Sequence, residues 1–252
     1  MLGIQVSIGA LNDLVDVPLD AARKPGKPIP AGLVSARAAR LVASGGGVVA
    51  LGLSAPSGAL TVAAAVGGLG CGYLYDLRLS RTALSWLPLA IALPLLPIHA
   101  WLGATGTVPP GLIGLLPAGF FAGAALALAN AVVDIDRDSD VGRRTIAVRL
   151  GQGRAWAANV VMLGAVALMV VMIGPVVPPD GPERDLGILR AVRLAGFGLG
   201  SAAAAFGAVV LTSRRAAIRE RGWELEAIGI AAIGLGWLAG TAATVAGGGA
   251  GV

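Results

Sequence analysis

Charged, aromatic and reactive residues are scarce in this sequence, and each shortage excludes a class of protein. The 252 residues include one cysteine and one histidine, and aromatic residues make up only 4% of the chain. The lone Cys71 excludes a disulfide framework, and the lone His99 leaves no histidine cluster that could bind zinc. Charged residues make up 13% of the chain, about half the share that is typical of soluble globular domains.

Apolar residues are abundant instead, and they predict a lipid environment. They supply 56% of the chain, and the mean hydropathy is +0.81. Eight apolar segments approach the roughly 20 residues that a helix needs to cross a hydrocarbon core: 1–17, 38–55, 59–75, 84–102, 111–133, 155–177, 187–212 and 225–246. Because lipid offers the backbone no hydrogen bonds, we expect all eight to be helices. The predicted fold class is therefore all-α, a polytopic membrane helix bundle.

The organisation of the chain is predicted to be simple. No polar stretch is long enough to fold separately, so a single transmembrane domain is expected over residues 1–246. Residues 247–252 consist of uncharged glycine, alanine and valine, and we expect them to form a flexible tail.

Basic residues occupy alternate connections between the apolar segments. All 19 of them lie in the connections after the first, third, fifth and seventh segments or, for Arg40, at the adjoining start of the second segment, except Arg184, Arg190 and Arg193. By the positive-inside rule these four connections face the cytoplasm, which predicts a multi-pass protein of the cell membrane. The net charge of +5 thus belongs to short loops, and no nucleic-acid partner is expected.

Three carboxylates stand out near the end of the first apolar segment. Asp13, Asp16 and Asp20 follow one another at spacings of three and four residues, which places them on one stripe of a helix. Like charges on one stripe repel, and an acid at the bilayer centre costs at least about 2.5 kcal/mol. A bound cation is the simplest compensation.

A second acidic cluster follows the fifth apolar segment, on the same predicted side of the membrane. On a continuous helix Asp134 and Asp138 share one face with Asn130. Asp136 and Asp140 point away from that face and are expected to be solvated and paired with nearby arginines, namely Arg137, Arg143 or Arg144.

Two such clusters fit Mg²⁺, which prefers oxygen ligands and bridges protein carboxylates to substrate phosphates. A diphosphate is therefore the expected ligand. Basic side chains that could neutralise it follow the first cluster and the third apolar segment: Arg23, Lys24, Lys27, Arg78 and Arg81. The same bases also satisfy the positive-inside rule and could face lipid headgroups, so both interpretations stay open.

These motifs resemble the two signatures of the UbiA-type intramembrane prenyltransferases. The first signature, Asn-Asp-x-x-Asp-x-x-x-Asp, is matched by Asn12, Asp13, Asp16 and Asp20. The stretch from Lys27 to Gly32 is similar to the family's Arg-Pro-x-x-x-Gly. The second signature, Asp-x-x-x-Asp followed by Gly-x-x-Thr, is similar to Asp134, Asp138, Gly142 and Thr145.

The resemblance implies a nine-helix bundle around a central cavity, so the eight segments counted here predict that the family's first helix is missing. It implies Mg²⁺-dependent transfer of a prenyl group from a polyprenyl diphosphate to an acceptor, with an aromatic, quinone-precursor-like compound expected. The active site would face the cytoplasm, and no partner beyond membrane lipid and the substrates is implied.

The resemblance also assigns roles to individual residues. The catalytic and metal-binding residues would be Asp13, Asp16, Asp20, Asp134 and Asp138. The substrate-binding residues would be Asn12, Arg23, Lys27, Arg78, Arg81 and Asn130.

Three departures from the family pattern leave alternatives, and the first of them is the missing first helix. Lys27 stands where the family has arginine, and Pro18 removes a backbone hydrogen bond inside the first motif. A relative that is catalytically impaired without the first helix is one alternative. A membrane transporter with acids along an ion path is another, although acids at helix ends beside basic loops favour the enzyme.

Overall fold

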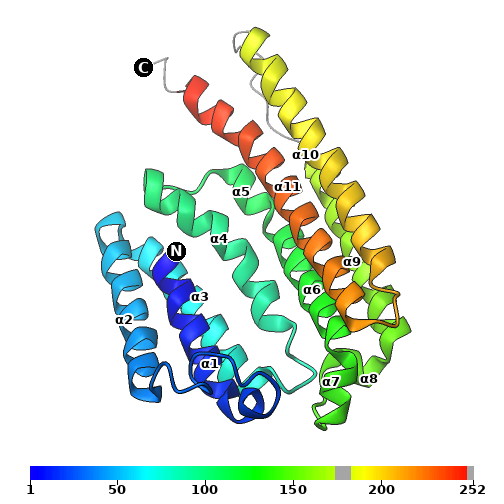
Figure 1. Cartoon of the computed structure of the whole chain (residues 1–252). Coiled ribbons are helices and arrows are strands. Elements are labelled where there is room, and N and C mark those ends of the chain that lie inside the picture. Colours follow the sequence, from blue (N-terminus) through cyan, green and yellow to red (C-terminus); the bar gives the residue numbers. More distant parts are fainter. Residues whose placement is uncertain (174–182, 249–252) are drawn as a thin grey trace. The chain divides into compact units, whose positions relative to one another are not determined.

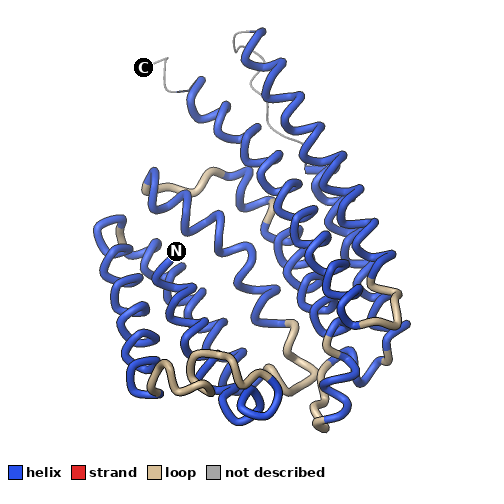
Figure 2. The backbone as a smooth tube through the Cα atoms, viewed as in Figure 1, coloured by secondary structure: helices blue, strands red, loops and turns tan. Residues whose placement is uncertain are grey.

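A computed structural model describes residues 1–173 and 183–248, and every regular element in these ranges is helical (Figure 2). The chain divides into two compact units, Met1–Val108 and Pro109–Val252, which are described separately. A single domain over residues 1–246 stays a prediction. Of the predicted tail at 247–252, the last four residues lie outside the described ranges.

The first unit consists of four long helices with two short extensions (Figure 1). The long helices are α1 (Leu2–Arg23), α2 (Ala36–Ser54), α3 (Ala59–Leu74) and α4 (Leu87–Thr105). A 3₁₀ turn, η1 (Ala55–Ser57), extends α2, and a π-helical turn, η2 (Tyr75–Leu79), extends α3. Ser35 begins α2 as its N-cap, because its hydroxyl accepts a hydrogen bond of 3.1 Å from the backbone N–H of Ala38.

Glycine allows α1 and α2 to touch through their backbones. A Cβ added at Gly3 would lie 2.8 Å from the carbonyl oxygen of Gly46, and one at Gly46 would lie 2.9 Å from the carbonyl oxygen of Gly3. The Ser7 hydroxyl donates a 2.6 Å hydrogen bond to the carbonyl of Ala43 across the same contact. Close backbone approach through small residues is the usual way for helices to associate in lipid.

The second unit is built around α6, most of whose residues are buried. Its described elements are α5 (Pro110–Gly114), α6 (Leu116–Val133), α7 (Ile135–Asp140), α8 (Ile146–Leu150), α9 (Gln152–Ile173), α10 (Glu183–Val210) and α11 (Ala216–Gly248). Helices α10 and α11 form a hairpin whose backbones meet at glycines. A Cβ at Gly207 would lie 2.5 Å from the carbonyl oxygen of Gly222, and one at Gly229 would lie 2.5 Å from that of Gly200.

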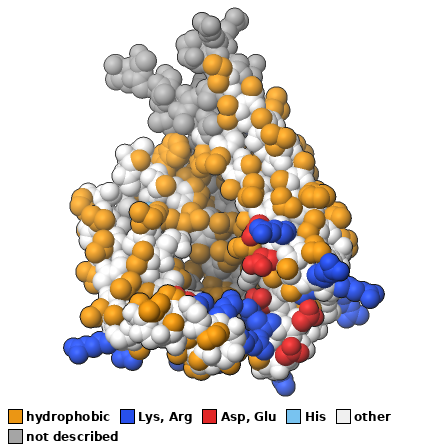
Figure 3. Space-filling model, in the orientation of Figure 1, with side chains coloured by type: hydrophobic (Ala, Val, Ile, Leu, Met, Phe, Trp, Pro, Cys, Tyr) orange, Lys and Arg blue, Asp and Glu red, His pale blue; other side chains and the backbone are white. Residues whose placement is uncertain are grey.

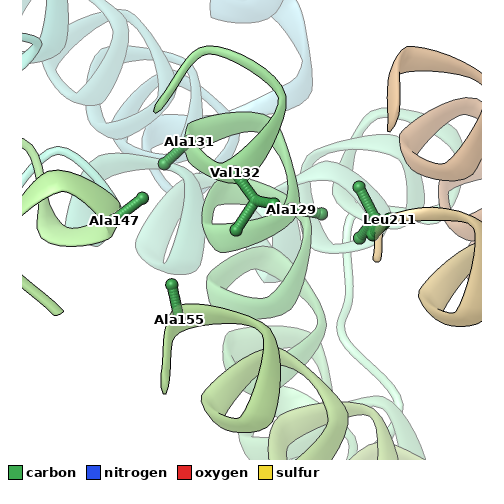
Figure 4. Packing of buried hydrophobic residues seen from close by; sticks show 6 residues of the cluster. All are labelled: Ala129, Ala131, Val132, Ala147, Ala155 and Leu211. Atoms are coloured by element: carbon green, nitrogen blue, oxygen red, sulfur yellow. The ribbon is translucent and has the colours of Figure 1, made fainter. Parts of the chain in front are cut away.

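A cluster of small apolar side chains lies where α6 ends (Figure 4). Ala129, Ala131 and Val132 of α6 belong to one core cluster with three further buried residues, Ala147, Ala155 and Leu211. The small side chains let α8 and α9 approach α6 closely. This core ends two residues before Asp134, so the second acidic motif begins on a packed support.

Six described helical segments are long and apolar enough to cross a membrane: Ala36–Ser57, Ala59–Leu79, Leu87–Thr105, Leu116–Val133, Gln152–Ile173 and Ala191–Val210. The predicted apolar segments at 1–17 and 225–246 are also helical, within α1 and α11. Hydrophobic side chains cover the sides of the helices, whereas lysines and arginines gather toward the ends where loops lie (Figure 3). The predicted all-α class is confirmed for the described residues.

Candidate active site

The first acidic motif converges on a positive charge. The Lys27 ammonium donates hydrogen bonds to Asp13 Oδ1 at 2.8 Å and to Asp20 Oδ2 at 2.6 Å. These two acids lie two helical turns apart on α1, as the predicted stripe requires. The helix continues through Pro18 to Arg23, so Asp20 keeps its place on the stripe.

The loop after α1 folds back to bring Lys27 to these acids. The N–H of Lys27 donates to the carbonyl of Lys24 at 3.0 Å, and the N–H of Ala31 donates to the carbonyl of Lys27 at 2.9 Å. Gly32 ends this sequence of turns with a φ of +72°. Only glycine adopts that conformation readily, which explains the glycine that closes the stretch starting at Lys27.

The site is suited to a cation. The hydrogen bond that Lys27 donates to Asp13, and next the one that it donates to Asp20, raise the pKa of Lys27 above its usual value, so its ammonium stays charged. Two carboxylates that reach one ammonium can also bind one divalent ion. Within the described part of the chain, there is no group of three or more carboxylate, imidazole or thiol side chains close enough to hold a metal ion. A bound ion would therefore complete its coordination with water and phosphate oxygens, as Mg²⁺ does.

Asn12, the first residue of the motif, is held by an acid that sequence reasoning missed. Its amide donates a 2.9 Å hydrogen bond to Oδ1 of Asp76 in the π turn η2. Asp76 is only 4% exposed. The sequence did contain a signal, because a lone carboxylate in an apolar span is costly and usually functional.

The remaining basic residues predicted for the first unit lie at its surface. Arg23 ends α1, Arg78 lies within η2 and Arg81 follows that turn, and all three are exposed. Their exposure is compatible with phosphate or with lipid headgroups, so the two interpretations of these bases stay open.

The second acidic motif lies at a break between two helices. Helix α6 ends at Val133, and Asp134 has φ −90° and ψ 3°, outside the helical values, before α7 begins. The predicted continuous face from Asn130 to Asp138 is thus interrupted at Asp134. Asp138 still lies one turn on, because its N–H donates to the carbonyl of Asp134 at 2.8 Å. The half-buried Asn130 lies on the last turn of α6, where its carbonyl accepts from the Asp134 N–H at 3.2 Å.

Arginines from the motif itself accompany its two acids. Asp134 pairs with Arg137, and Asp138 lies 3.5 Å from the Arg143 guanidinium. Asp138 is 4% exposed, and this burial raises the pKa of its carboxyl although Arg143 and Arg137 oppose the shift. Gly142, with a φ of +69°, closes the turn before Arg143.

The predicted partners of Asp136 are wrong. Asp136 pairs with Arg219 of α11 at 2.7 Å, whereas Arg137 and Arg143 pair with the motif acids. Arg219 was counted in the basic connection after the seventh segment, but it lies in α11 and only 1% of its surface is exposed. Its guanidinium also donates to three carbonyls, those of Val133 at 3.0 Å, Ser213 at 3.3 Å and Arg214 at 3.0 Å. Arg219 therefore links α11 by hydrogen bonds to the turn that contains Asp134. Asp140 is exposed, as predicted.

A buried polar pair also links three helices of the second unit. The Asn159 amide of α9 donates to Glu226 Oε2 of α11 at 3.0 Å and to the Ala125 carbonyl of α6 at 2.9 Å. Asn159 and Glu226 are both completely buried. Local spacing could not reveal this pair, because its members are 67 residues apart.

Helices of membrane-spanning length and two acidic motifs define the class of this protein as a polytopic membrane protein with acidic clusters on its helices. The sequence profile of the UbiA prenyltransferase family matches residues 1–181, and the chain belongs to this family. The resemblance stated from the motifs is thereby confirmed.

Curated relatives and a solved structure agree with this assignment. The digeranylgeranylglyceryl phosphate synthase of Methanopyrus kandleri is 29% identical over 162 residues, which are 64% of this chain and 59% of that protein. The 4-hydroxybenzoate octaprenyltransferase of Nitrosomonas europaea is 34% identical over 145 residues, which are 57% of this chain and 50% of that protein. The chain thus spans little more than half the length of these relatives.

A UbiA homologue from Archaeoglobus fulgidus, bound to GPP and Mg²⁺, has the same fold. The TM-score is 0.65 at 19% identity, and the match covers 92% of this chain and 84% of that chain. This likeness confirms the predicted polytopic membrane helix bundle, and the chain is a multi-pass membrane protein.

Proposed function

We propose that this protein transfers a prenyl group from a polyprenyl diphosphate to an acceptor within the membrane, in a Mg²⁺-dependent reaction. The observation that carries the proposal is the convergence of Asp13 and Asp20 on one positive charge, inside a signature of a prenyltransferase family. The homologue from Archaeoglobus fulgidus that is bound to GPP and Mg²⁺ supports the same donor chemistry and cofactor.

The acids of each motif would hold metal: Asp13, Asp16 and Asp20 in the first, and Asp134 and Asp138 in the second. Bound Mg²⁺ would supply positive charge that stabilises the negative charge gained by the departing diphosphate. Lys27 neutralises Asp13 and Asp20 in the described arrangement. A metal held by those acids would leave the Lys27 ammonium available to donate to diphosphate oxygens.

The other basic and amide side chains would bind the donor. Arg23, Arg78 and Arg81 offer charge-assisted hydrogen bonds to diphosphate, and Asn12 and Asn130 orient it. The allylic C–O bond then breaks with its electron pair leaving on the diphosphate. A nucleophilic atom of the acceptor captures the carbocation, and the proton that the acceptor loses passes to the departed diphosphate, while the apolar helices keep water from the cation.

The acceptor is proposed to be aromatic, as in the relative named 4-hydroxybenzoate octaprenyltransferase. A prenylated glycerol phosphate is the second candidate, because the relative from Methanopyrus kandleri is named for digeranylgeranylglyceryl phosphate. The positive-inside pattern of the loops supports an active site on the cytoplasmic side of the cell membrane.

The test is diphosphate release and product formation by purified protein in liposomes. Geranylgeranyl diphosphate would be offered with aromatic acids including 4-hydroxybenzoate and, separately, with geranylgeranylglyceryl phosphate, in Mg²⁺ or in EDTA. We expect release only in Mg²⁺, with one acceptor class clearly preferred.

Two acid-to-amide variants, Asp16→Asn and Asp134→Asn, should lower the rate at least about 100-fold through lost metal binding. Glu224→Gln is the matched control, because it removes an exposed carboxylate paired only with exposed Arg221 among the contacts of the described residues. No release by folded wild-type protein with any acceptor would contradict the proposal and favour a catalytically impaired relative.

A further inference from the structure

Asp76 is a buried acid that none of the predicted roles includes. It lies in the π turn η2, two residues before Arg78, and is 4% exposed. π turns interrupt helices at a cost and occur frequently at functional sites. Here the wide turn places a carboxylate against the first acidic motif.

The two oxygens of Asp76 have different surroundings. Oδ1 accepts the 2.9 Å hydrogen bond from the Asn12 amide. Oδ2 is buried, and no donor within the described residues hydrogen-bonds to it. An ionised carboxylate accepts but never donates, so this contact also fixes which end of the Asn12 amide faces Asp76.

The charge of Asp76 is close to that of another acid. Asp16, one turn beyond Asn12 on α1, lies near enough for the two carboxylates to repel each other. The ammonium of Lys27 is engaged by Asp13 and Asp20. A buried carboxylate oxygen without a donor and beside a like charge is unfavourable unless positive charge compensates it.

We propose that Asp76 is a positioning residue of the first acidic motif, which holds Asn12 through one oxygen and adds negative charge to the motif's divalent-cation site. The inference rests on the proposed function, because it takes that motif to bind a metal. It differs from a role in packing alone, since an uncharged side chain would hold the Asn12 amide equally well.

Two substitutions separate the charge from the hydrogen bond. Asp76→Asn keeps an oxygen that can accept from Asn12 but removes the charge, and Asp76→Glu keeps the charge. Mn²⁺ serves as the probe for the metal, and its binding to purified protein in nanodiscs is followed by electron paramagnetic resonance, with and without inorganic diphosphate. Glu224→Gln is again the control for loss of an unrelated carboxylate.

We expect Asp76→Asn to bind Mn²⁺ at least about tenfold more weakly than wild type. Its metal-free thermal stability should be equal or higher, because repulsion with Asp16 is relieved. Asp76→Glu should restore most of the affinity, and the control should match wild type. If Asp76→Asn does not fold, Asp76→Glu is compared with Asp76→Ala instead. Clearly stronger Mn²⁺ binding by Asp76→Glu would support the proposal. Equal Mn²⁺ binding by the two variants would overturn it.

An Mn²⁺ affinity of Asp76→Asn within twofold of wild type would overturn the role of Asp76. If wild type still transferred the prenyl group in that case, the proposed function would stand. Wild type that binds no Mn²⁺ under either condition would overturn both the role of Asp76 and the metal requirement of the proposed function.

Discussion

Replacing Arg219 with methionine should be among the more damaging single changes in the second unit. The variant keeps an unbranched apolar stem but loses every donor of a guanidinium that is 1% exposed. Three backbone carbonyls then lose their partner, together with the carboxylate of Asp136.

The loss of stability in Arg219→Met depends on how well water can solvate each group that Arg219 contacts. The Asp136 side chain is 71% exposed, so water replaces the guanidinium and the ion pair contributes at most about 1 kcal/mol. Each carbonyl hydrogen bond contributes about 1 kcal/mol, so the three together account for roughly 3 kcal/mol. Arg219→Met should therefore cost about 3–4 kcal/mol, whereas Asp136→Asn should cost about 1 kcal/mol or less.

Thermal unfolding in detergent, followed by tryptophan fluorescence, would measure the difference. At about 2–4 °C per kcal/mol, Arg219→Met should lower Tm by roughly 6–16 °C. Arg221→Gln is the matched control on the same helix, because the Arg221 side chain is 75% exposed, and its Tm should barely change. If Asp136→Asn lowered Tm as much as Arg219→Met, the carbonyls would not be the main partners and the reasoning would be refuted.

Three further predictions concern packing, the first motif and pH. Gly229→Ala should lower the free energy of unfolding by about 1–3 kcal/mol or more, because the added Cβ would lie 2.5 Å from a backbone oxygen. Gly234→Ala is the control, because a Cβ there would lie in open space. Equal Tm values for the two variants would contradict this prediction. Lys27→Met leaves two acids without their ammonium, so millimolar Mg²⁺ should raise its Tm more than that of wild type, and equal increases would argue against a shared site. Burial raises the pKa of Asp138 in the folded protein. Its favourable contribution to the free energy of unfolding is therefore complete below the usual carboxyl pKa of 3.8 and is lost as pH rises through the folded pKa. Asp138→Asn should flatten the dependence of Tm on pH over that window.

The fold could be predicted from the sequence because lipid leaves the backbone few options. Each apolar segment had to satisfy its own hydrogen bonds, which requires helices. Which helices touch was less accessible. Glycines such as Gly45 and Gly52 have open space at the Cβ position, whereas Gly46 contacts α1 directly, and composition alone does not distinguish them.

The candidate site was predictable where its chemistry is local. Asp13, Asp16 and Asp20 are recognisable because their spacing places like charges on one helical stripe. Asp76 and Arg219 were missed because their partners are distant in sequence, 64 residues away for Asn12 and 83 for Asp136. A count of loop charges placed Arg219 in the connection before the last apolar segment, whereas it lies buried in α11, where three carbonyls accept from it.

The glycine contacts have a consequence for how the protein enters the membrane. Helices α10 and α11 are joined by only five residues and meet backbone to backbone at Gly207 and Gly222 near the turn. Such a hairpin satisfies its own backbone hydrogen bonds and already has its packing partner, whereas Glu226 finds its partner Asn159 only on α9. The two helices can therefore associate as one pair before the remaining helices of their unit pack around them.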